Sequence, residues 1–145
     1  MSAGGPDRIV LAVELDAPPA AVWAALARPP QLANWWGDHV SLDARLGGAL
    51  SERWRDAEGR ESVTLGEVTE LRPGELLALS WRDQDWAVGT EVRFEIEPLP
   101  DDRSRLTLTH SGWEAFPAEE RDSIVSAHRS GWERHLANLR EHLGG

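Results

Sequence analysis

The segment TEVRFEIEPL, residues Thr90–Leu99, is the clearest strand in this chain of 145 residues. Its apolar side chains Val92, Phe94 and Ile96 alternate with charged ones, which is the pattern of a strand with one face buried and one face in water. An apolar sheet face is stable only when another layer covers it. The fold therefore depends on the element that covers this sheet.

The C-terminal segment supplies that cover as an amphipathic helix. Its apolar residues and one histidine recur at three- and four-residue spacing, which places them on one helix face: Val125, His128, Trp132, Leu136, Leu139 and Leu143. Acidic residues lie near its start and basic residues near its end, as the helix dipole favours. Gly144 is placed to end the helix.

The rest of the chain is predicted to form a strand, two short helices and a meander. Arg8–Leu15 alternates like a strand, and the proline pairs that follow indicate short helices at about Pro19–Ala27 and Pro30–Trp35. From Val40 to Ser111, short alternating runs between Gly, Pro and Asp indicate an antiparallel meander of about six strands. The predicted fold class is α+β, with a curved antiparallel sheet of about six to seven strands wrapped around the long C-terminal helix.

The length and composition fit a single globular domain, 1–145, with about residues 1–7 as a flexible N-terminus. The net charge of −10, without a basic cluster, argues against nucleic acid or an anionic membrane surface as a partner. The start of the chain lacks a secretory signal, and no apolar run approaches the roughly 20 residues that span a bilayer. We therefore expect a cytoplasmic protein. The chain has no Cys, which excludes disulfides and a cysteine nucleophile.

Tryptophan is the unusual component, with eight residues against two Phe and no Tyr. Trp combines a large apolar ring system with one N–H that needs an acceptor, so it suits both a core and the wall of a ligand pocket. Core packing is the simpler interpretation for most of them. The eight are Trp23, Trp35, Trp36, Trp54, Trp81, Trp86, Trp113 and Trp132.

A tripeptide, Ser-Gly-Trp, occurs twice, at Ser111–Trp113 and Ser130–Trp132. The first copy ends a predicted strand and the second lies inside the predicted helix, so the copies are not repeats of one structural unit. A glycine inside a helix costs roughly 0.5–1 kcal/mol relative to Ala. Gly131 therefore indicates close backbone packing or space left empty, unless it is there by chance.

Histidines are the candidate titratable groups. Strand alternation points His110 to the buried face, where it is either a hydrogen-bonded core residue or a catalytic group that titrates near neutrality. His128, His135 and His142 are spaced by seven residues along the helix. Neighbours in that row are about 10.5 Å apart, too far to chelate one metal ion. We expect no metal site, although one that combines a single histidine with other elements stays open.

Glu52 shares strand parity with Leu50 and Trp54, so it faces the core if they do. A buried carboxylate needs a partner or has a raised pKa, and such groups are common at functional sites. The alternative is an edge strand with a bulge that turns Glu52 outward. The sequence has neither a nucleophile elbow nor a phosphate-binding glycine loop, so we expect no cofactor.

Six stretches carry a resemblance to a known family: AVWAALARPPQLANWWG, LGGAL, GEVTELRPGELLALSW, GTEVRFEIEPL, RLTLTHSGW and HRSGWERHLANL. In this order they resemble the START-like (SRPBCC) superfamily, and within it the family of homologues of the activator of the heat-shock-protein-90 ATPase. The resemblance implies a helix-grip fold with a cavity between sheet and helix, which in relatives often accepts an apolar molecule. It brings no catalytic motif. The domain that precedes this one in the eukaryotic co-chaperone is not found here, which weakens a co-chaperone role.

The sequence leaves three functions open. The first is a module that holds a small apolar or aromatic molecule between sheet and helix, without chemistry of its own. The second is a protein-interaction module that regulates a chaperone ATPase, as part of the stress response, or another partner. The third is an enzyme, such as a cyclase or hydrolase of an aromatic metabolite, that uses His110 with Glu52. The residues predicted to bind a ligand are Trp35, Trp36, Glu52, Trp54, Trp81, Phe94, His110, His128, Gly131, Trp132 and His135.

Overall fold

In the part of the chain that the structure describes, seven antiparallel strands form one sheet in the order β1-β7-β6-β5-β4-β3-β2. The computed structural model describes residues 8–37 and 39–144, so the predicted flexible N-terminus, residues 1–7, lies outside the described residues. The strands are β1 (Arg8–Leu15), β2 (Val40–Leu42), β3 (Ala49–Arg55), β4 (Glu61–Arg72), β5 (Leu76–Asp83), β6 (Thr90–Leu99) and β7 (Arg103–Ser111). Strands β2 to β7 are the predicted meander.

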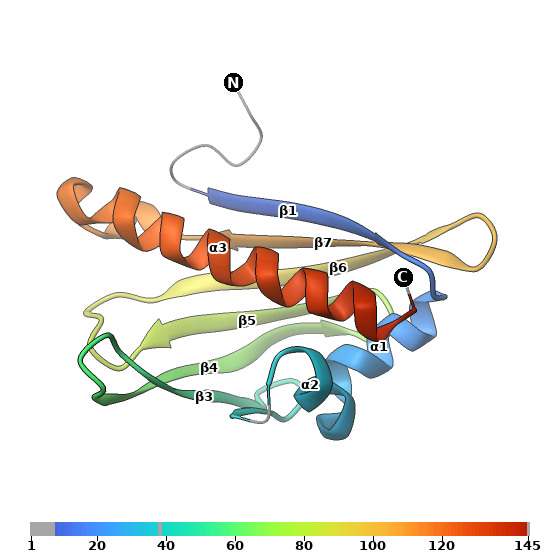
Figure 1. Ribbon diagram of the computed structural model, residues 1–145, viewed down its shortest axis with the longest axis horizontal. Helices are drawn as coiled ribbons and strands as arrows, with labels where there is room; N and C mark the ends of the chain where they lie inside the picture. Colours follow the sequence, from blue (N-terminus) through green and yellow to red (C-terminus); the bar gives the residue numbers. More distant parts are fainter. Residues whose placement is uncertain (1–7, 38, 145) are drawn as a thin grey trace.

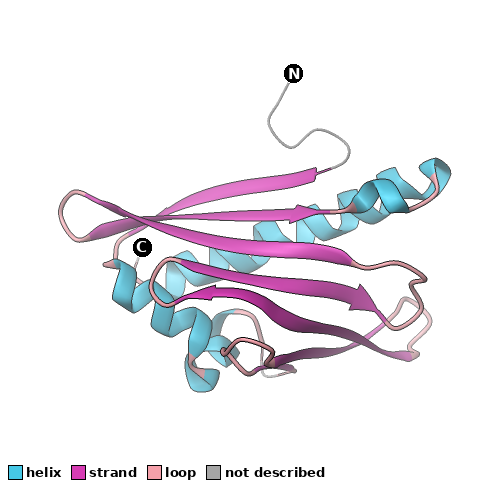
Figure 2. Ribbon diagram, turned by 180° about the vertical axis from the view of Figure 1, so that it is seen from behind, coloured by secondary structure: helices cyan, strands magenta, loops and turns pink. Residues whose placement is uncertain are grey.

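Within the described ranges, the helical elements are α1 (Pro19–Ala27), α2 (Pro29–Trp35), the short 3-10 helix η1 (Trp113–Ala115) and α3 (Ala118–His142). Helix α2 begins one residue earlier than predicted, because the first turn of a helix accepts prolines that lack a backbone N–H. Figure 1 shows α3 crossing one face of the sheet, with α1 and α2 near its C-terminal end. Figure 2, from behind, shows that the helices of the described chain leave the other face uncovered. This arrangement confirms the predicted fold class.

The core lies between the inner face of the sheet and α3. Val92, Phe94 and Ile96 are buried, as their alternation predicts. Phe94 pairs with Leu77 of β5 on one side and with Leu108 of β7 on the other, and both partners are fully buried. The buried side chains that α3 contributes are Val125, Trp132, Leu136 and Leu139.

The first Ser-Gly-Trp turns the chain out of the sheet toward α3. Strand β7 ends at Ser111, and Gly112 follows with φ of 100°, a left-handed conformation that residues with a Cβ rarely adopt. Trp113 is fully buried in η1, where its indole donates a hydrogen bond to the His110 carbonyl at 2.9 Å. The second copy lies inside α3, so the two copies occupy different structural contexts, as predicted.

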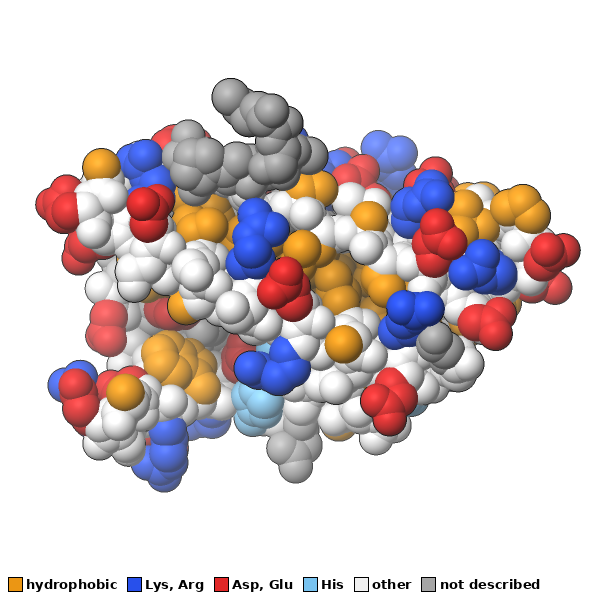
Figure 3. All heavy atoms as spheres, turned by 45° about the horizontal axis from the view of Figure 1, so that its top comes forward, with side chains coloured by type: hydrophobic (Ala, Val, Ile, Leu, Met, Phe, Trp, Pro, Cys, Tyr) orange, Lys and Arg blue, Asp and Glu red, His pale blue; other side chains and the backbone are white. Residues whose placement is uncertain are grey.

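The surface of the domain mixes both signs of charge. On the face shown in Figure 3, arginine and acidic side chains are interspersed with small apolar areas. The most exposed large apolar side chains among the described residues are Leu46 and Leu65. None of the described helices combines the length and apolar character needed to cross a membrane.

Candidate functional site

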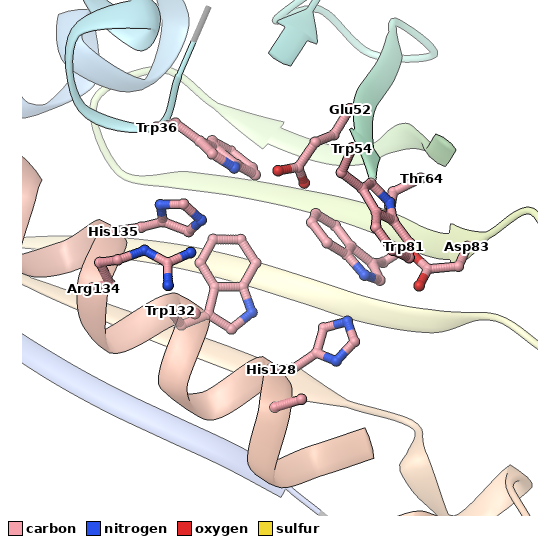
Figure 4. A pocket seen from close by; sticks show the side chains of 12 residues that line it. Trp36, Glu52, Trp54, Thr64, Trp81, Asp83, His128, Trp132, Arg134 and His135 are labelled. Carbon is pink, nitrogen blue, oxygen red and sulfur yellow. The ribbon is translucent and has the colours of Figure 1, made fainter. Parts of the chain in front are cut away.

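A cavity of about 330 Å³ lies between α3 and strands β3, β4 and β5. This volume is near the lower end of the range for small-molecule sites. Figure 4 shows aromatic rings, histidines and carboxylates from both layers around this space. Ala127 and Arg134 of α3 are exposed, so the cavity opens to solvent beside them. The lining residues are Trp36, Glu52, Trp54, Thr64, Trp81, Asp83, Ala127, His128, Gly131, Trp132, Arg134 and His135.

The sheet side of the cavity carries polar residues in one row across three strands. Glu52 of β3 pairs with Thr64 of β4, and Thr64 pairs with Asp83 of β5. Residues directly opposite one another on neighbouring strands point to the same face of the sheet. Trp54 and Trp81 lie two residues from Glu52 and Asp83, so strand alternation places them on that face too. One patch of sheet thus combines two carboxylates with two indoles.

Glu52 is held inside this wall by a hydrogen bond with His39. Its side chain is 13% exposed, and its Oε2 lies 2.9 Å from Nε2 of His39. Burial raises the pKa of the Glu52 carboxyl, and the adjacent His39 opposes that rise. The alternative of a bulge that turns Glu52 outward is wrong, because β2 pairs with this part of β3 and the β3–β4 register is regular through Arg55.

Asp83 is the second carboxylate of the row. It accepts a hydrogen bond from the Thr64 hydroxyl, which in turn accepts one from the Trp54 indole at 3.0 Å. Burial raises the pKa of the Asp83 carboxyl, while the Thr64 hydrogen bond and the neighbouring His128 oppose that rise. Because a hydroxyl has a single proton to donate, Trp54, Thr64 and Asp83 form a directed chain of hydrogen bonds.

Three tryptophans form the aromatic wall of the cavity. The ring centroids are 5.2 Å apart for Trp36 and Trp132, 5.3 Å for Trp81 and Trp132, and 6.2 Å for Trp36 and Trp81. Trp36 and Trp81 are only 3% and 5% exposed, yet their indole nitrogens have no hydrogen-bond partner among the described residues. The Trp36 N–H lies toward Glu52 and lowers the pKa of that carboxyl, without reaching hydrogen-bond geometry. An unpaired buried donor costs about 1–3 kcal/mol, so both indoles lack an acceptor that they need.

The α3 side of the cavity is formed by two neutral histidines and a glycine. His128 Nδ1 donates to the Ile124 carbonyl at 3.0 Å, which leaves Nε2 as the acceptor. Burial lowers the pKa of His128, and burial together with the adjacent Arg134 lowers the pKa of His135 to about 4. An ideal Cβ built on Gly131 meets no atom within 4 Å. Gly131 therefore borders open space and not a tight helix–sheet contact.

His110 joins sheet and helix behind the aromatic wall. The Trp132 indole donates to His110 Nδ1 at 3.0 Å, so Nδ1 carries no proton and Nε2 does. Nε2 then donates to the Thr90 hydroxyl at 2.7 Å, and that hydroxyl donates to the Trp81 carbonyl at 3.2 Å. His110 is fully buried, and burial holds its pKa well below the ordinary value. Both ring nitrogens are engaged, as in the core interpretation of this residue.

Eight of the eleven residues predicted to bind a ligand line the cavity, and Trp35, Phe94 and His110 do not. Trp35 packs against α1, where its indole donates to the Ala25 carbonyl at 2.8 Å. Phe94 is fully buried in the core. His110 lies behind the wall, so it does not meet Glu52 in the cavity. The acid–base pair that the enzyme hypothesis required is therefore not formed.

Four lining residues were missed by the sequence reasoning: Thr64, Asp83, Ala127 and Arg134. Asp83 is two residues from Trp81, so the parity argument applied to Glu52 would have found it. Thr64 has no comparable signal, because its place depends on the pairing of β3, β4 and β5.

The row of three histidines along α3 is divided by the fold. His128 and His135 line the cavity, whereas His142 contacts the side chain of Gln31 in α2 at 3.3 Å. In the described ranges, no three His, Asp or Glu side chains gather as a metal ion would require. Two of the histidines therefore belong to the cavity, and the third belongs to the contact between α3 and α2.

Comparison with known proteins identifies the family. Residues 16–144 match the AHSA1 family, described as "Activator of Hsp90 ATPase homolog 1-like protein". The chain belongs to this family. The match covers all the elements from α1 to α3, which agrees with the resemblance drawn from the sequence.

Solved structures share the fold of this AHSA1 domain. A protein from Chromobacterium violaceum is 26% identical with a TM-score of 0.76, and the match covers 97% of this chain and 99% of that one. An Hsp90 activator from Plasmodium falciparum is 22% identical with a TM-score of 0.77, covering 95% and 96%. DynU16, from the dynemicin biosynthetic locus, is 22% identical with a TM-score of 0.75, and this chain covers 47% of its length, about half. No curated protein matches the chain.

Proposed function

We propose that this AHSA1 domain binds a small aromatic molecule in the cavity between α3 and strands β3, β4 and β5. The observation that carries the proposal is the cavity lining, in which four tryptophans stand beside two carboxylates and two histidines. Sites for small molecules are lined mainly by apolar and aromatic side chains, with a few polar groups that fix the orientation of the ligand. A ligand with a flat ring and a polar substituent fits such a lining.

The shape of the cavity supports the same proposal. The rings of Trp36, Trp81 and Trp132 make an apolar wall, and the part-exposed ring of Trp54 provides surface on which an aromatic ring stacks favourably. Gly131 lines the cavity on the helix side, and an added Cβ at this position would meet no atom within 4 Å. The exposed rim at Ala127 and Arg134 provides an entrance. The ligand we expect is therefore compact, aromatic and equipped with a polar group.

Calorimetric titration and native mass spectrometry with uncharged phenols, indoles and aromatic ketones test this function. We expect at least one class to bind the wild-type protein and to lose binding in Gly131→Leu, which fills the space beside the rings. Ser130→Leu is the matched control, because it adds the same side chain at an exposed neighbouring position of α3. Absence of binding across the panel, or equal binding by Gly131→Leu and the wild type, would contradict the proposal.

A second candidate function is the regulation of a chaperone ATPase. For this function we propose that the protein is located in the cytoplasm. The regulatory function is supported by the family description and by the similarity to the Hsp90 activator from Plasmodium falciparum, at 22% identity. The test is the steady-state ATPase rate of purified Hsp90 with and without the domain, together with a pull-down from lysate. An unchanged rate and no recovered chaperone would rule this function out. Gly131→Leu separates the two candidates, because it fills the cavity and changes one half-buried position of α3.

A further inference from the structure

The cavity lining has more acidic than basic side chains. Glu52 and Asp83 lie on its sheet side, whereas Arg134 is the formal cation of the described lining and is exposed at the rim. His128 and His135 are neutral near pH 7, because burial lowers the pKa of each ring. The chain as a whole has a net charge of −10, which attracts small cations and repels anions.

Each carboxylate keeps one oxygen available to the cavity. Glu52 uses Oε2 for His39, and Asp83 uses Oδ1 for Thr64. The other oxygens, Oε1 and Oδ2, accept no hydrogen bond from the described residues. Burying an ionised carboxylate is costly unless a donor or a cation compensates it. A bound cation would add to the compensation that His39 and Thr64 provide at this wall.

The tryptophans favour the same type of ligand. The face of an indole ring is electron-rich and attracts a cation, with Trp the strongest of the aromatic side chains. Trp36, Trp81 and Trp132 contact one another in the wall, and Trp54 lies on the same sheet face as the two carboxylates. Aromatic faces next to carboxylates are the combination that recognises organic ammonium groups.

We propose that the ligand of this cavity is a small aromatic amine bound as its ammonium cation, with the ammonium beside Glu52 and Asp83 and the ring against the tryptophans. This inference rests on the proposed ligand-binding function. The N–H groups of the ammonium donate to Glu52 Oε1 and Asp83 Oδ2. An anionic analogue is repelled by the same carboxylates, and a neutral analogue lacks the charge attraction to them.

Three probes with the same hydroxyphenyl ring test the charge preference: tyramine as the ammonium, tyrosol as the neutral alcohol and phloretate as the carboxylate. Calorimetric titration near neutral pH should give tyramine a Kd at least about tenfold below that of tyrosol. Phloretate should bind most weakly. These probes differ mainly in charge, so the order of their affinities reports the charge preference of the cavity.

Isosteric variants identify the source of that preference. In Glu52→Gln and in Asp83→Asn, we expect tyramine to lose at least about fivefold in affinity while tyrosol stays within about twofold. Glu61→Gln is the matched control, because it removes the same charge at an exposed position of β4 outside the cavity. Thermal unfolding of each variant checks that the domain remains folded.

The contrary results are distinct. Tyrosol or phloretate binding as tightly as tyramine would overturn the inference and leave the proposed ligand-binding function standing. A tyramine preference that survives both carboxylate variants unchanged would also overturn it. Failure of all three probes to bind would overturn the inference as well. The proposed ligand-binding function is tested separately, by the panel of uncharged phenols, indoles and aromatic ketones and by Gly131→Leu.

Discussion

Gly131→Leu is the most informative single substitution, because it tests whether the helix side of the cavity is open space. Leu is roughly 0.8 kcal/mol more favourable than Gly within a helix. An added Cβ at this position meets no atom within 4 Å, so the substitution introduces no clash with the backbone. A Leu side chain half-buried against the tryptophans adds about 1 kcal/mol from apolar burial. The free energy of unfolding should therefore rise by about 1–2 kcal/mol in total.

Urea unfolding followed by far-ultraviolet circular dichroism measures this change. The melting temperature should rise by about 3–6 °C for a domain of this size. Gly131→Ala is the control, which should stabilise by about 0.5–1 kcal/mol through helix propensity and still bind ligand. A loss of about 1–3 kcal/mol in Gly131→Leu would mean that α3 packs tightly on the sheet here, and the reasoning would be refuted. Stability retained together with unchanged ligand binding would show that Gly131 borders neither a ligand nor the sheet.

Three further results are expected. Trp132→Ala should cost about 3–5 kcal/mol of unfolding free energy, since Trp132 is 2% exposed at the centre of the core, and an unchanged denaturant midpoint would contradict this. Thr90→Val should cost about 1–3 kcal/mol by leaving the Nε2–H of His110 unpaired, while Thr107→Val, on the outer face of β7, should stay within about 0.5 kcal/mol. Between pH 6.5 and about 4, the unfolded chain protonates at the position of His135 while the folded protein resists it, so His135 makes stability fall as the pH falls. The raised pKa of the two cavity carboxylates acts in the opposite direction. The measurement is therefore the slope of unfolding free energy against pH, compared between the wild type and His135→Gln. Identical slopes would show that the folded ring protonates normally.

The sequence by itself determined the elements and the layers of this fold. The alternation in Thr90–Leu99 and the three- and four-residue spacing from Val125 to Leu143 depend only on the local periods of strands and helices. Those periods determine which faces are apolar. An apolar sheet face must be covered by another layer, so the same periods also indicate which faces are buried. The inward direction of His110 followed from the same parity. Local periodicity therefore accounts for the fold and for the side of the sheet on which the cavity lies.

Only the tertiary structure decided which of these inward residues share the cavity. Trp35 and Trp36 are adjacent in sequence, yet Trp35 packs on α1 and Trp36 lines the cavity, because successive residues at the end of α2 point in different directions. The row of Glu52, Thr64 and Asp83 exists only through the register of β3, β4 and β5. Register depends on contacts between residues far apart in the chain, and no local pattern specifies it fully. For the same reason, the alternation that pointed His110 inward did not reveal that Trp132 and Thr90 would occupy both of its nitrogens.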